Sequence, residues 1–313
     1  MNTIQALSFS PITLAHRARY EEITRDLCPD ADHAFANLYM WQDLYHQSIA
    51  FFDEGNCHRA VIRFCTENGC RYLFPAGRGE ITPVLMQMRE NARQRGEFLA
   101  FVGVTEAQLQ ELPLSLRSEF EITENRDIAD YLYSAESLAT LAGKKLHAKR
   151  NHINAFTAAH TWEVHPLTPE HADTCRALFA RWAEGREPLS VAVEQAAIER
   201  ALSAFTELGL EGALLLADSE PAAFTVGSMV TSDTLCVHIE KGRPDMNGVF
   251  PLINREFVRM MLEKHPTLTT VNREDDMGLE NLRKAKMAYR PLKLLTKYTL
   301  LDTSPKSTNT TLL

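Results

Sequence analysis

The sequence predicts an α/β (α+β) fold built as two similar halves, each a mixed and mostly antiparallel sheet flanked by helices. The chain has 313 residues, a length typical of two domains of ordinary size. Short β-like runs bounded by Gly and Asn alternate with segments of helical periodicity. The same alternation occurs before Asp130 and again after Trp162, which places the joint between the halves near residues 125–140.

The first expected domain, residues 1–130, is rich in hairpin signals, because Gly and Asn separate its β-like runs. Thr105 is a good helix N-cap, since its hydroxyl can accept a hydrogen bond from a free backbone N–H group. Gly96 is typical of a helix end. The predicted elements are an extended segment at 7–12, helical material at 14–27, a buried aromatic stretch at 35–44, strands at 47–52, 60–65 and 71–74, a helix at 81–95, a strand at 98–104 and a helix at 106–112.

The second expected domain, residues 131–302, contains the clearest β material of the chain. Three successive β-like runs with turns between them predict an antiparallel meander. Thr168 followed by Pro169 is typical of a helix start. The predicted elements are a strand at 162–167, helices at 168–182 and 193–208, strands at 212–218, 222–230 and 234–240, a helix at 249–262, a strand at 267–271, a helix at 278–288 and a closing strand at 292–301. Residues 303–313, rich in Ser, Thr and Asn, are expected to be a disordered tail.

Composition and charge exclude several classes of protein. Apolar residues make up 45% and charged residues 24%, the usual globular balance, and the net charge of -8 argues against a surface that coats nucleic acid. No apolar run reaches the roughly 18 residues of a membrane span. A cytoplasmic location with free thiols is therefore expected. The six cysteines form no Cys-x-x-Cys pair, and a zinc site at Cys57, Cys65 and Cys70 would need an unusual spacing, so we expect no metal.

A basic stretch stands out in this acidic chain. Ser134 can cap a helix there, and the apolar pattern of residues 130–156 fits either one helical stripe or a pair of short helices broken at Gly143. One interpretation is a solvated helix face, and the other is a site for the phosphates of a nucleotide or tRNA. The polar residues of the basic stretch are Lys144, Lys145, His147, Lys149, Arg150, Asn151 and His152.

Two further segments of the second half are candidates for chemistry. His238 and Glu240 alternate along one strand and are predicted to share a face, where Glu240 could act as a general base or hold an acceptor amine, with His238 beside it. The alternative is a satisfied histidine and a surface glutamate. The following Gly-bearing loop opens a helix, where free N–H groups and the helix dipole can bind an anion. The loop residues considered are Lys241, Arg243, Asn247 and Gly248.

The charges after the next strand allow two interpretations as well. Arg273 and Glu274 are a candidate site pair if the strand edge faces a cleft, with Glu274 as a third catalytic candidate, or an acidic helix start if it does not. Lys286 is a candidate anion contact, and Tyr289 is a candidate donor contact or a packing residue. No Ser-His-Asp order, Walker loop or His-Glu-x-x-His motif is present in the sequence.

Residues 144–156, 237–241 and 271–291 carry a family resemblance. They read Lys-Lys-Leu-His-Ala-Lys-Arg-Asn-His-Ile-Asn-Ala-Phe, Val-His-Ile-Glu-Lys, and Val-Asn-Arg-Glu-Asp-Asp-Met-Gly-Leu-Glu-Asn-Leu-Arg-Lys-Ala-Lys-Met-Ala-Tyr-Arg-Pro. These segments resemble soluble, stand-alone relatives of the C-terminal catalytic domain of phosphatidylglycerol lysyltransferases, which is similar to the Fem-type aminoacyltransferases. The resemblance covers nearly the whole chain and implies two GNAT-like folds in tandem.

The resemblance also implies a reaction, the transfer of an acyl or aminoacyl group. The donor would be aminoacyl-tRNA or an acyl-CoA, and the acceptor an amine or hydroxyl of a small molecule, a peptide or a lipid headgroup. The loop from Arg243 to Gly248 departs from the Arg-x-x-Gly-x-Gly pattern of GNAT donor loops, which makes a tRNA donor competitive with coenzyme A. The rival hypothesis is a non-catalytic tRNA- or nucleotide-binding module. An enzyme is favoured if Glu240, Arg273 and Glu274 line the same cleft as the basic stretch.

Overall fold

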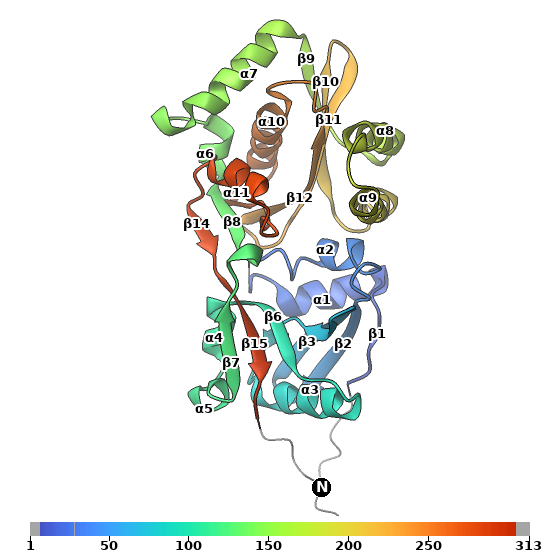
Figure 1. Cartoon of the computed structure of the whole chain (residues 1–313), viewed down its shortest axis with the longest axis vertical. Helices are drawn as coiled ribbons and strands as arrows, with labels where there is room; N and C mark the ends of the chain where they lie inside the picture. Colours follow the sequence, from blue (N-terminus) through green and yellow to red (C-terminus); the bar gives the residue numbers. More distant parts are fainter. Residues whose placement is uncertain (1–6, 28, 305–313) are drawn as a thin grey trace, which may run out of the picture.

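Two β-sheets, one in each half of an elongated molecule, form the framework of the protein (Figure 1). The computed structural model describes residues 7–27 and 29–304. The first sheet has the strand order β1-β2-β3-β4-β6-β15-β7, with β5 paired to β3, and the second has the order β14-β8-β13-β12-β11-β10-β9. Both sheets are mixed, mostly antiparallel and flanked by helices, which confirms the predicted fold class.

The first half is close to its prediction. Thr105 caps a helix as expected, because its side chain accepts from the Gln108 N–H while the Gln108 side chain accepts from the Thr105 N–H. The elements are β1 Ser10–Pro11, η1 Leu14–His16, α1 Arg17–Thr24, α2 Phe35–Met40, β2 Ser48–Glu54, β3 Cys57–Thr66, β4 Gly69–Tyr72, β5 Ala76–Arg78, α3 Thr82–Gln94, β6 Ala100–Thr105, α4 Glu106–Glu111, α5 Leu114–Arg117, β7 Phe120–Glu124 and η2 Arg126–Ile128.

The second half contains the predicted antiparallel meander, formed by β10, β11 and β12. The elements are β8 Asp130–Ser134, α6 Ala135–Thr140, η3 Lys144–Leu146, α7 His147–Ala159, β9 Trp162–Pro166, η4 Pro169–His171, α8 Ala172–Ala183, α9 Pro188–Ser203, β10 Glu211–Ala217, β11 Glu220–Met229, β12 Thr234–Gly242, α10 Val249–Lys264, β13 Thr270–Asn272, α11 Glu280–Met287, β14 Lys293–Leu295 and β15 Lys297–Asp302. The predicted tail lies largely outside the described residues.

The segment that contains the basic stretch forms two helices, α6 and α7, which is the second of the two alternatives that its apolar pattern allows. Ser134 accepts a hydrogen bond from the Ser137 N–H and so caps α6. The helix ends at Leu141, whose φ of 50° lies in the left-handed region, and Gly143, with φ of 85°, completes the break before α7.

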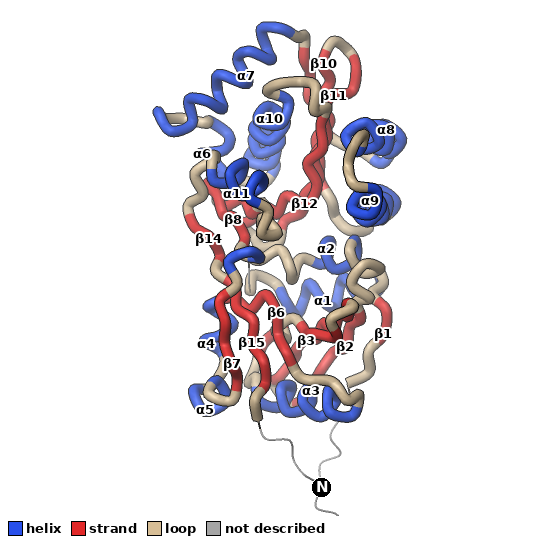
Figure 2. The backbone as a smooth tube through the Cα atoms, viewed as in Figure 1, coloured by secondary structure: helices blue, strands red, loops and turns tan. Residues whose placement is uncertain are grey.

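Helices cover the two faces of the second sheet differently (Figure 2). One face packs against α6, α7 and α10 in a core of its own, which includes Ile153, Leu235 and Phe257. The other face packs against α8 and α9, and this core continues into residues of the first half such as Tyr20 and Phe35. The two halves therefore share hydrophobic core, and burial of that shared apolar surface stabilises their arrangement.

The sheets depart from the expected domain boundary at the end of the chain. The expected closing strand, residues 292–301, is two strands in different sheets. β14 pairs with β8 in the second sheet, whereas β15 lies between β6 and β7 in the first. Lys297 explains the crossing, because its buried amino group contacts both Asp130 at the start of β8 and Asp32 in the first half.

The expectation of free thiols is wrong for one pair of cysteines. Cys65 and Cys70 lie directly opposite each other on β3 and β4 and form a disulfide. The hairpin register brings their Cα atoms to 4.0 Å, so no zinc site with Cys57 forms from these thiols. Cys57, Cys175 and Cys236 are free and buried.

A buried imidazolium in the first half makes stability depend on pH. His33 Nδ1 contacts Asp30 Oδ1 at 2.9 Å and Nε2 contacts the carbonyl oxygen of Phe74 at 2.9 Å. Both partners can only accept while Asp30 is ionised, so both ring nitrogens carry protons. Burial opposes this charge, but Asp30, the Phe74 carbonyl and Asp32 outweigh burial and raise the pKa of His33 to about 9.

We expect the free energy of unfolding to fall by about 3 kcal/mol as pH rises from about 6.5 through 9. The folded pKa lies above the unfolded value of 6.5, so this stability is complete below 6.5 and is lost as His33 deprotonates. Urea titrations of the protein at several pH values measure the loss. His33→Gln should flatten the curve in this window, and His165→Gln, at an exposed histidine, should not. An unchanged curve for His33→Gln contradicts the assignment.

Candidate functional site

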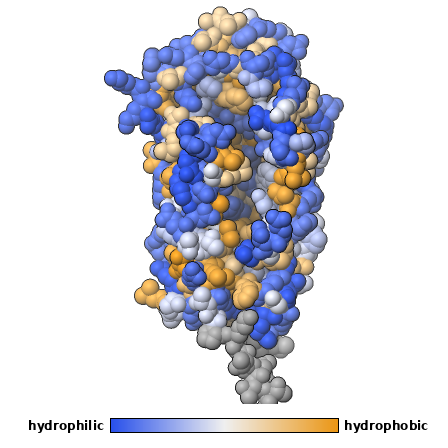
Figure 3. Space-filling view, in the orientation of Figure 1, coloured by the Kyte–Doolittle hydropathy of each residue, from blue (hydrophilic) through white to orange (hydrophobic). Residues whose placement is uncertain are grey.

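The second sheet opens between two parallel strands. β12 pairs with β13 only from Thr234 to Cys236, and β12 then continues to Gly242 without β13 beside it. After Asn272 the chain leaves the sheet into the loop that precedes α11. The face drawn in Figure 3 is mostly hydrophilic and is hollowed over β12, between α11 and the α8–α9 pair. The opening places the side chains that follow Val237 and Asn272 next to each other.

Five side chains, which we call the split cluster, meet at this opening. They come from β8, α7, β12, the loop after β13 and the chain after α11, and they are Tyr133, Lys149, Glu240, Arg273 and Tyr289. Arg273 Nη2 donates to Glu240 Oε1 at 2.9 Å, and the Arg273 guanidinium lies 4.8 Å from the Tyr289 ring centroid. Lys149 Nζ lies 4.0 Å from the same centroid. The sequence candidates Lys149, Glu240, Arg273 and Tyr289 are therefore brought together.

The electrostatics of the split cluster favour a negatively charged ligand. Burial, reinforced by the nearby Arg273 charge, lowers the pKa of Lys149, and Glu240 opposes this shift. Burial raises the pKa of Tyr289 to about 12, so its hydroxyl stays protonated. Two cationic side chains thus face one carboxylate. Arg273 Nη1 is also buried, and no described residue partners it within the geometric limits of a hydrogen bond.

Glu240 lies at the opening, near the end of β12. Its Oε1 pairs with Arg273, and its Oε2 accepts from Asn254 Nδ2 on α10 at 3.2 Å. Its side chain is only 13% exposed. These contacts fix the direction of the carboxylate, and its catalytic role stays a prediction.

A β-bulge separates His238 from Glu240. Val226 on β11 is opposite Ile239 and Gly227 is opposite Val237, so His238 has no partner position on β11. Val237 packs in the core under α10, whereas Ile239 packs in the core under α8 and α9. The bulge interrupts the strict alternation on which the prediction of a shared face depends. His238 and Glu240 consequently have different partners.

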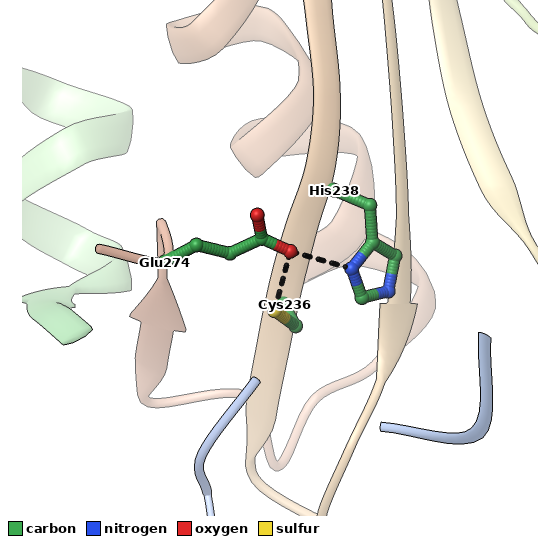
Figure 4. Close-up of side chains that lie close together, drawn as sticks. All are labelled: Cys236, His238 and Glu274. Carbon is green, nitrogen blue, oxygen red and sulfur yellow. Dashed lines mark hydrogen bonds and ion pairs between the residues drawn. The ribbon is translucent and has the colours of Figure 1, made fainter. Parts of the chain in front are cut away.

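His238 belongs to a second group, the His238 relay, which comprises Ser228, His238 and Glu274. His238 Nδ1 lies 3.0 Å from Glu274 Oε1, and Nε2 lies 2.8 Å from Ser228 Oγ. Figure 4 shows the Glu274 carboxylate reaching across Cys236 of β12 toward the imidazole. Asn37 Nδ2 of α2 donates to the same carboxylate oxygen at 2.8 Å. The structure thus unites a serine, a histidine and a glutamate for which the sequence shows no recognised motif.

The relay residues also bear on metal binding. Within the described residues, one group of three side chains, Cys236, His238 and Glu274, could hold a metal ion. Their ligand atoms lie within 4.8 Å of one another. A metal would need the Cys236 thiolate, but burial raises the pKa of this thiol well above its usual value. Glu274 Oε1 already accepts from Asn37 and His238. The observed contacts join these side chains in a hydrogen-bonded network.

The rest of the basic stretch divides into exposed and structural residues. Arg150 Nη1 donates to the carbonyl oxygens of Leu141 and Gly143, so it stabilises the break between α6 and α7. Lys144 and Lys145 are exposed at the start of the stretch, as is His152 on α7. The exposed pair His147 and Asn151 interact with each other at 3.1 Å. Only Lys149 reaches the split cluster.

Lys241, inside β12, and Arg243, in the loop that follows, pair with carboxylates of the protein. Lys241 pairs with Glu194 at 2.7 Å and lies over the Trp182 ring, on the α8–α9 side of the sheet. Arg243 pairs with Asp245 within the loop, and Asn247 is exposed.

Gly248 has a structural reason for being glycine. A Cβ there would lie 2.3 Å from the His152 carbonyl oxygen, and its φ is 94°. Glycine at this position therefore lets α10 start against α7, independently of any ligand.

The loop after β13 is held from below by α11. Lys286 Nζ donates to the carbonyl oxygens of Arg273, at 2.6 Å, and Asp275. These contacts position Arg273 and Glu274, and the role of Lys286 as an anion contact stays a prediction. Glu274 has a φ of 56°, unusual for a residue with a Cβ, which indicates that the surrounding contacts impose its conformation.

Several site residues were missed by the sequence analysis. Tyr133 and Asn254 lie in apolar periodic segments and look like ordinary core positions. Ser228 lies inside a strand with no local motif. Lys297 could have been identified from the sequence, because a lysine inside the apolar closing strand suggests a buried ion pair.

A cleft of about 420 Å³ lies on another side of the relay. We call it the α1 cleft, because residues of α1 and of the β11–β12 turn contribute to its lining. Its lining includes Arg17, Arg25, His33, Ser228, Ser232 and His265. Ser228 is therefore shared between this cleft and the relay.

Solved structures define the class of fold. A conserved protein of unknown function from Bacteroides thetaiotaomicron is 34% identical, with a TM-score of 0.87 over 94% of this chain and 99% of that one. L-PGS from Bacillus licheniformis is 16% identical, with a TM-score of 0.62 over 95% and 94%. A tandem GNAT protein from the clavulanic acid biosynthesis pathway is 12% identical, with a TM-score of 0.53 over 96% and 99%. The fold is that of tandem GNAT-like proteins.

Residues 25–301 match the family described as phosphatidylglycerol lysyltransferase, C-terminal, and the chain belongs to this family. Family and fold together fit a GNAT-like transferase. An uncharacterized protein of Mycoplasmoides gallisepticum is 22% identical over 174 residues, 54% of each chain, so this chain spans about half the length of the curated relative it matches. Among the helices within residues 7–27 and 29–304, none has the length and apolar character to cross a membrane.

The contacts of α7 predict different effects for two adjacent basic residues. Arg150→Ala should lower the free energy of unfolding by about 1–2 kcal/mol, because two carbonyl oxygens lose a charged donor. Lys149→Ala should cost less than about 1 kcal/mol, since it removes one cation–π contact. Urea unfolding of both variants measures the difference. Equal losses, or a larger loss for Lys149→Ala, contradict these assignments.

Proposed function

We propose that the protein is an acyl- or aminoacyltransferase whose reaction takes place at the split cluster. The donor is aminoacyl-tRNA or an acyl-CoA, and the acceptor is an amine or a hydroxyl of a small molecule, a peptide or a lipid headgroup. The observation that carries this proposal is the buried arrangement of Glu240, Arg273, Lys149 and Tyr289 at the opening between β12 and β13. Membership of a lysyltransferase family and the GNAT-like fold support it.

The charges at the opening suit the developing charges of acyl transfer. When an amine or hydroxyl attacks an acyl carbonyl, negative charge develops on the carbonyl oxygen and a proton must leave the nucleophile. Arg273, whose guanidinium also interacts with the Tyr289 hydroxyl, is the buried donor that we assign to the oxygen. Glu240 is the acceptor for the proton, or for a hydrogen bond that orients an amine. Because both groups are largely buried, their interactions with a reacting centre are stronger than in water.

The basic stretch supplies positive charge beside the opening. Lys149 lies within the split cluster, and the exposed Lys144 and Lys145 begin the same stretch. Exposed lysines can contact phosphates of either donor at little cost to stability. Gly248 serves helix packing and the loop lacks the GNAT glycine pattern, so these two features favour a tRNA donor over coenzyme A.

The first experiment identifies the donor and separates an enzyme from a binding module. The purified protein is titrated with acetyl-CoA, aminoacyl-tRNA and uncharged tRNA at two salt concentrations, and transfer to candidate amines is followed with a radiolabelled acyl group. We expect one donor to bind and to be turned over. Binding without transfer supports the rival hypothesis of a non-catalytic module. Lack of binding by all three ligands overturns the proposal.

With a donor identified, Glu240→Gln should lower kcat by about 10²- to 10⁴-fold with little change in donor affinity. The amide keeps the shape of the side chain but cannot accept a proton. Glu194→Gln is the matched control, because Glu194 also pairs with a largely buried cation but on the opposite face of the sheet. A Glu240→Gln variant as active as the unaltered protein rules out the catalytic role.

A further inference from the structure

The His238 relay has the connectivity of a serine-nucleophile triad. A hydroxyl, an imidazole and a carboxylate follow one another at 2.8 Å and 3.0 Å, the hydrogen-bond reach that such a triad requires. The three residues come from β11, β12 and the loop after β13, separated by 10 and 36 positions in the sequence. The triad is recognised by geometry and roles, since unrelated folds present it in different chain orders.

The hydrogen bonds determine which nitrogen of His238 carries the proton. Burial would raise the pKa of Glu274, but its hydrogen bonds from His238 and Asn37 outweigh burial, and the pKa is lowered. The carboxylate is therefore ionised and can only accept, so Nδ1 donates to it. In the neutral imidazole, Nε2 is then an acceptor facing the Ser228 hydroxyl. This is the tautomer a general base needs to take a proton from a serine.

Access to the serine comes from the α1 cleft. The His238 side chain is fully buried, and Ser228, itself only 8% exposed, is one of the residues that line the cleft. A volume of about 420 Å³ suits a small acyl group with part of its leaving group. Arg25 and His33 line the same cleft, and the pKa of about 9 keeps His33 cationic at neutral pH. The lining also contains the carboxylates of Glu21, Asp26 and Glu211, so charges of both signs surround the space.

The backbone around Glu274 is built to hold this carboxylate in place. Asn272 Oδ1 accepts from the Glu274 N–H at 2.7 Å, and Lys286 donates to carbonyl oxygens on both sides of Glu274. The left-handed conformation of Glu274 is maintained by these contacts. A glutamate needed only to neutralise a surface charge would not require such support.

We propose that Ser228, His238 and Glu274 form an acyl-hydrolase site that takes small esters or thioesters from the α1 cleft. Ser228 Oγ bonds to the carbonyl carbon while its proton moves to His238 Nε2. The bond from that carbon to the leaving oxygen or sulfur then breaks, and Nε2 protonates the leaving group. Water attacks the acyl-serine with Nε2 as base, the bond to Ser228 Oγ breaks, and the proton returns to the serine as the carboxylic acid leaves. Glu274 acts as the positioning residue.

This site is independent of the transferase proposed above. The split cluster uses Glu240 and Arg273, and the hydrolase site uses neither. Failure of one proposal therefore leaves the other standing.

The experiment uses a fluorophosphonate reagent, which modifies activated serines. The full-length protein is incubated with it, the intact mass is measured over time, and the modified peptide is mapped. We expect one adduct, on Ser228. Ser228→Ala should abolish the adduct. Ser232→Ala is the control, because Ser232 lines the same cleft. It should leave the labelling rate unchanged, since Ser232 contacts Asp26 and Thr267 through backbone atoms that the substitution keeps.

Glu274→Gln tests the positioning role through two readouts, the labelling rate and the melting temperature. A slower rate at an unchanged melting temperature cannot come from a loss of structure. We expect its labelling rate, and its rate of p-nitrophenyl acetate hydrolysis, to fall at least 100-fold while its melting temperature stays near that of the unaltered protein. An unlabelled protein under conditions that label a reference serine hydrolase overturns the proposal. Equal labelling of Ser228→Ala also overturns it. Stoichiometric bound zinc that blocks labelling until chelated overturns it in favour of a metal site at Cys236, His238 and Glu274.

Discussion

The ion pair between Lys297 and Asp130 is the interaction on which the arrangement of both sheets depends. Lys297 Nζ lies 2.7 Å from Asp130 Oδ1 and 2.8 Å from Asp32 Oδ2, with the lysine and Asp130 fully buried. Burial disfavours the charge of Lys297, but the two aspartates outweigh burial and raise its pKa well above the usual value. Because an uncompensated buried charge costs several kcal/mol, β15 and β8 must remain together. The pair thereby joins the first sheet to the second.

Asn272 connects the same ion pair to the functional residues. Asn272 Nδ2 donates to Asp130 Oδ2 at 2.8 Å and to the Pro29 carbonyl oxygen, while its Oδ1 accepts from the Glu274 N–H. The loop after β13 is thus anchored to the joint between the halves. Arg273 turns toward Glu240 and Glu274 toward His238, so two chemically different groups originate from adjacent residues. Rigid support of this kind is what a site needs to hold charged groups in productive directions.

Much of the fold is predictable from local sequence signals. The features that are not predictable depend on contacts between residues far apart in the sequence. Ser134 and Thr105 cap the helices expected of them because capping depends on residues three apart. The bulge at His238 depends on the register of β11, and Ser228 meets His238 only through that register. Lys149 and Arg150 are indistinguishable in a basic stretch, yet successive helix positions point in different directions, toward Tyr289 and toward Leu141.

The position of β15 has a consequence for how the chain can fold during synthesis. Its only partners in the first sheet are β6 and β7, and β7 pairs with no strand other than β15 within the described residues. Domains of many proteins fold as soon as they leave the ribosome, beginning with the N-terminal one. In this protein β7 has no partner strand, and its backbone hydrogen-bonding groups stay unpaired, until β15 has left the ribosome. The halves are thus coupled in time as well as in space, and a chain released early would expose an unfinished sheet.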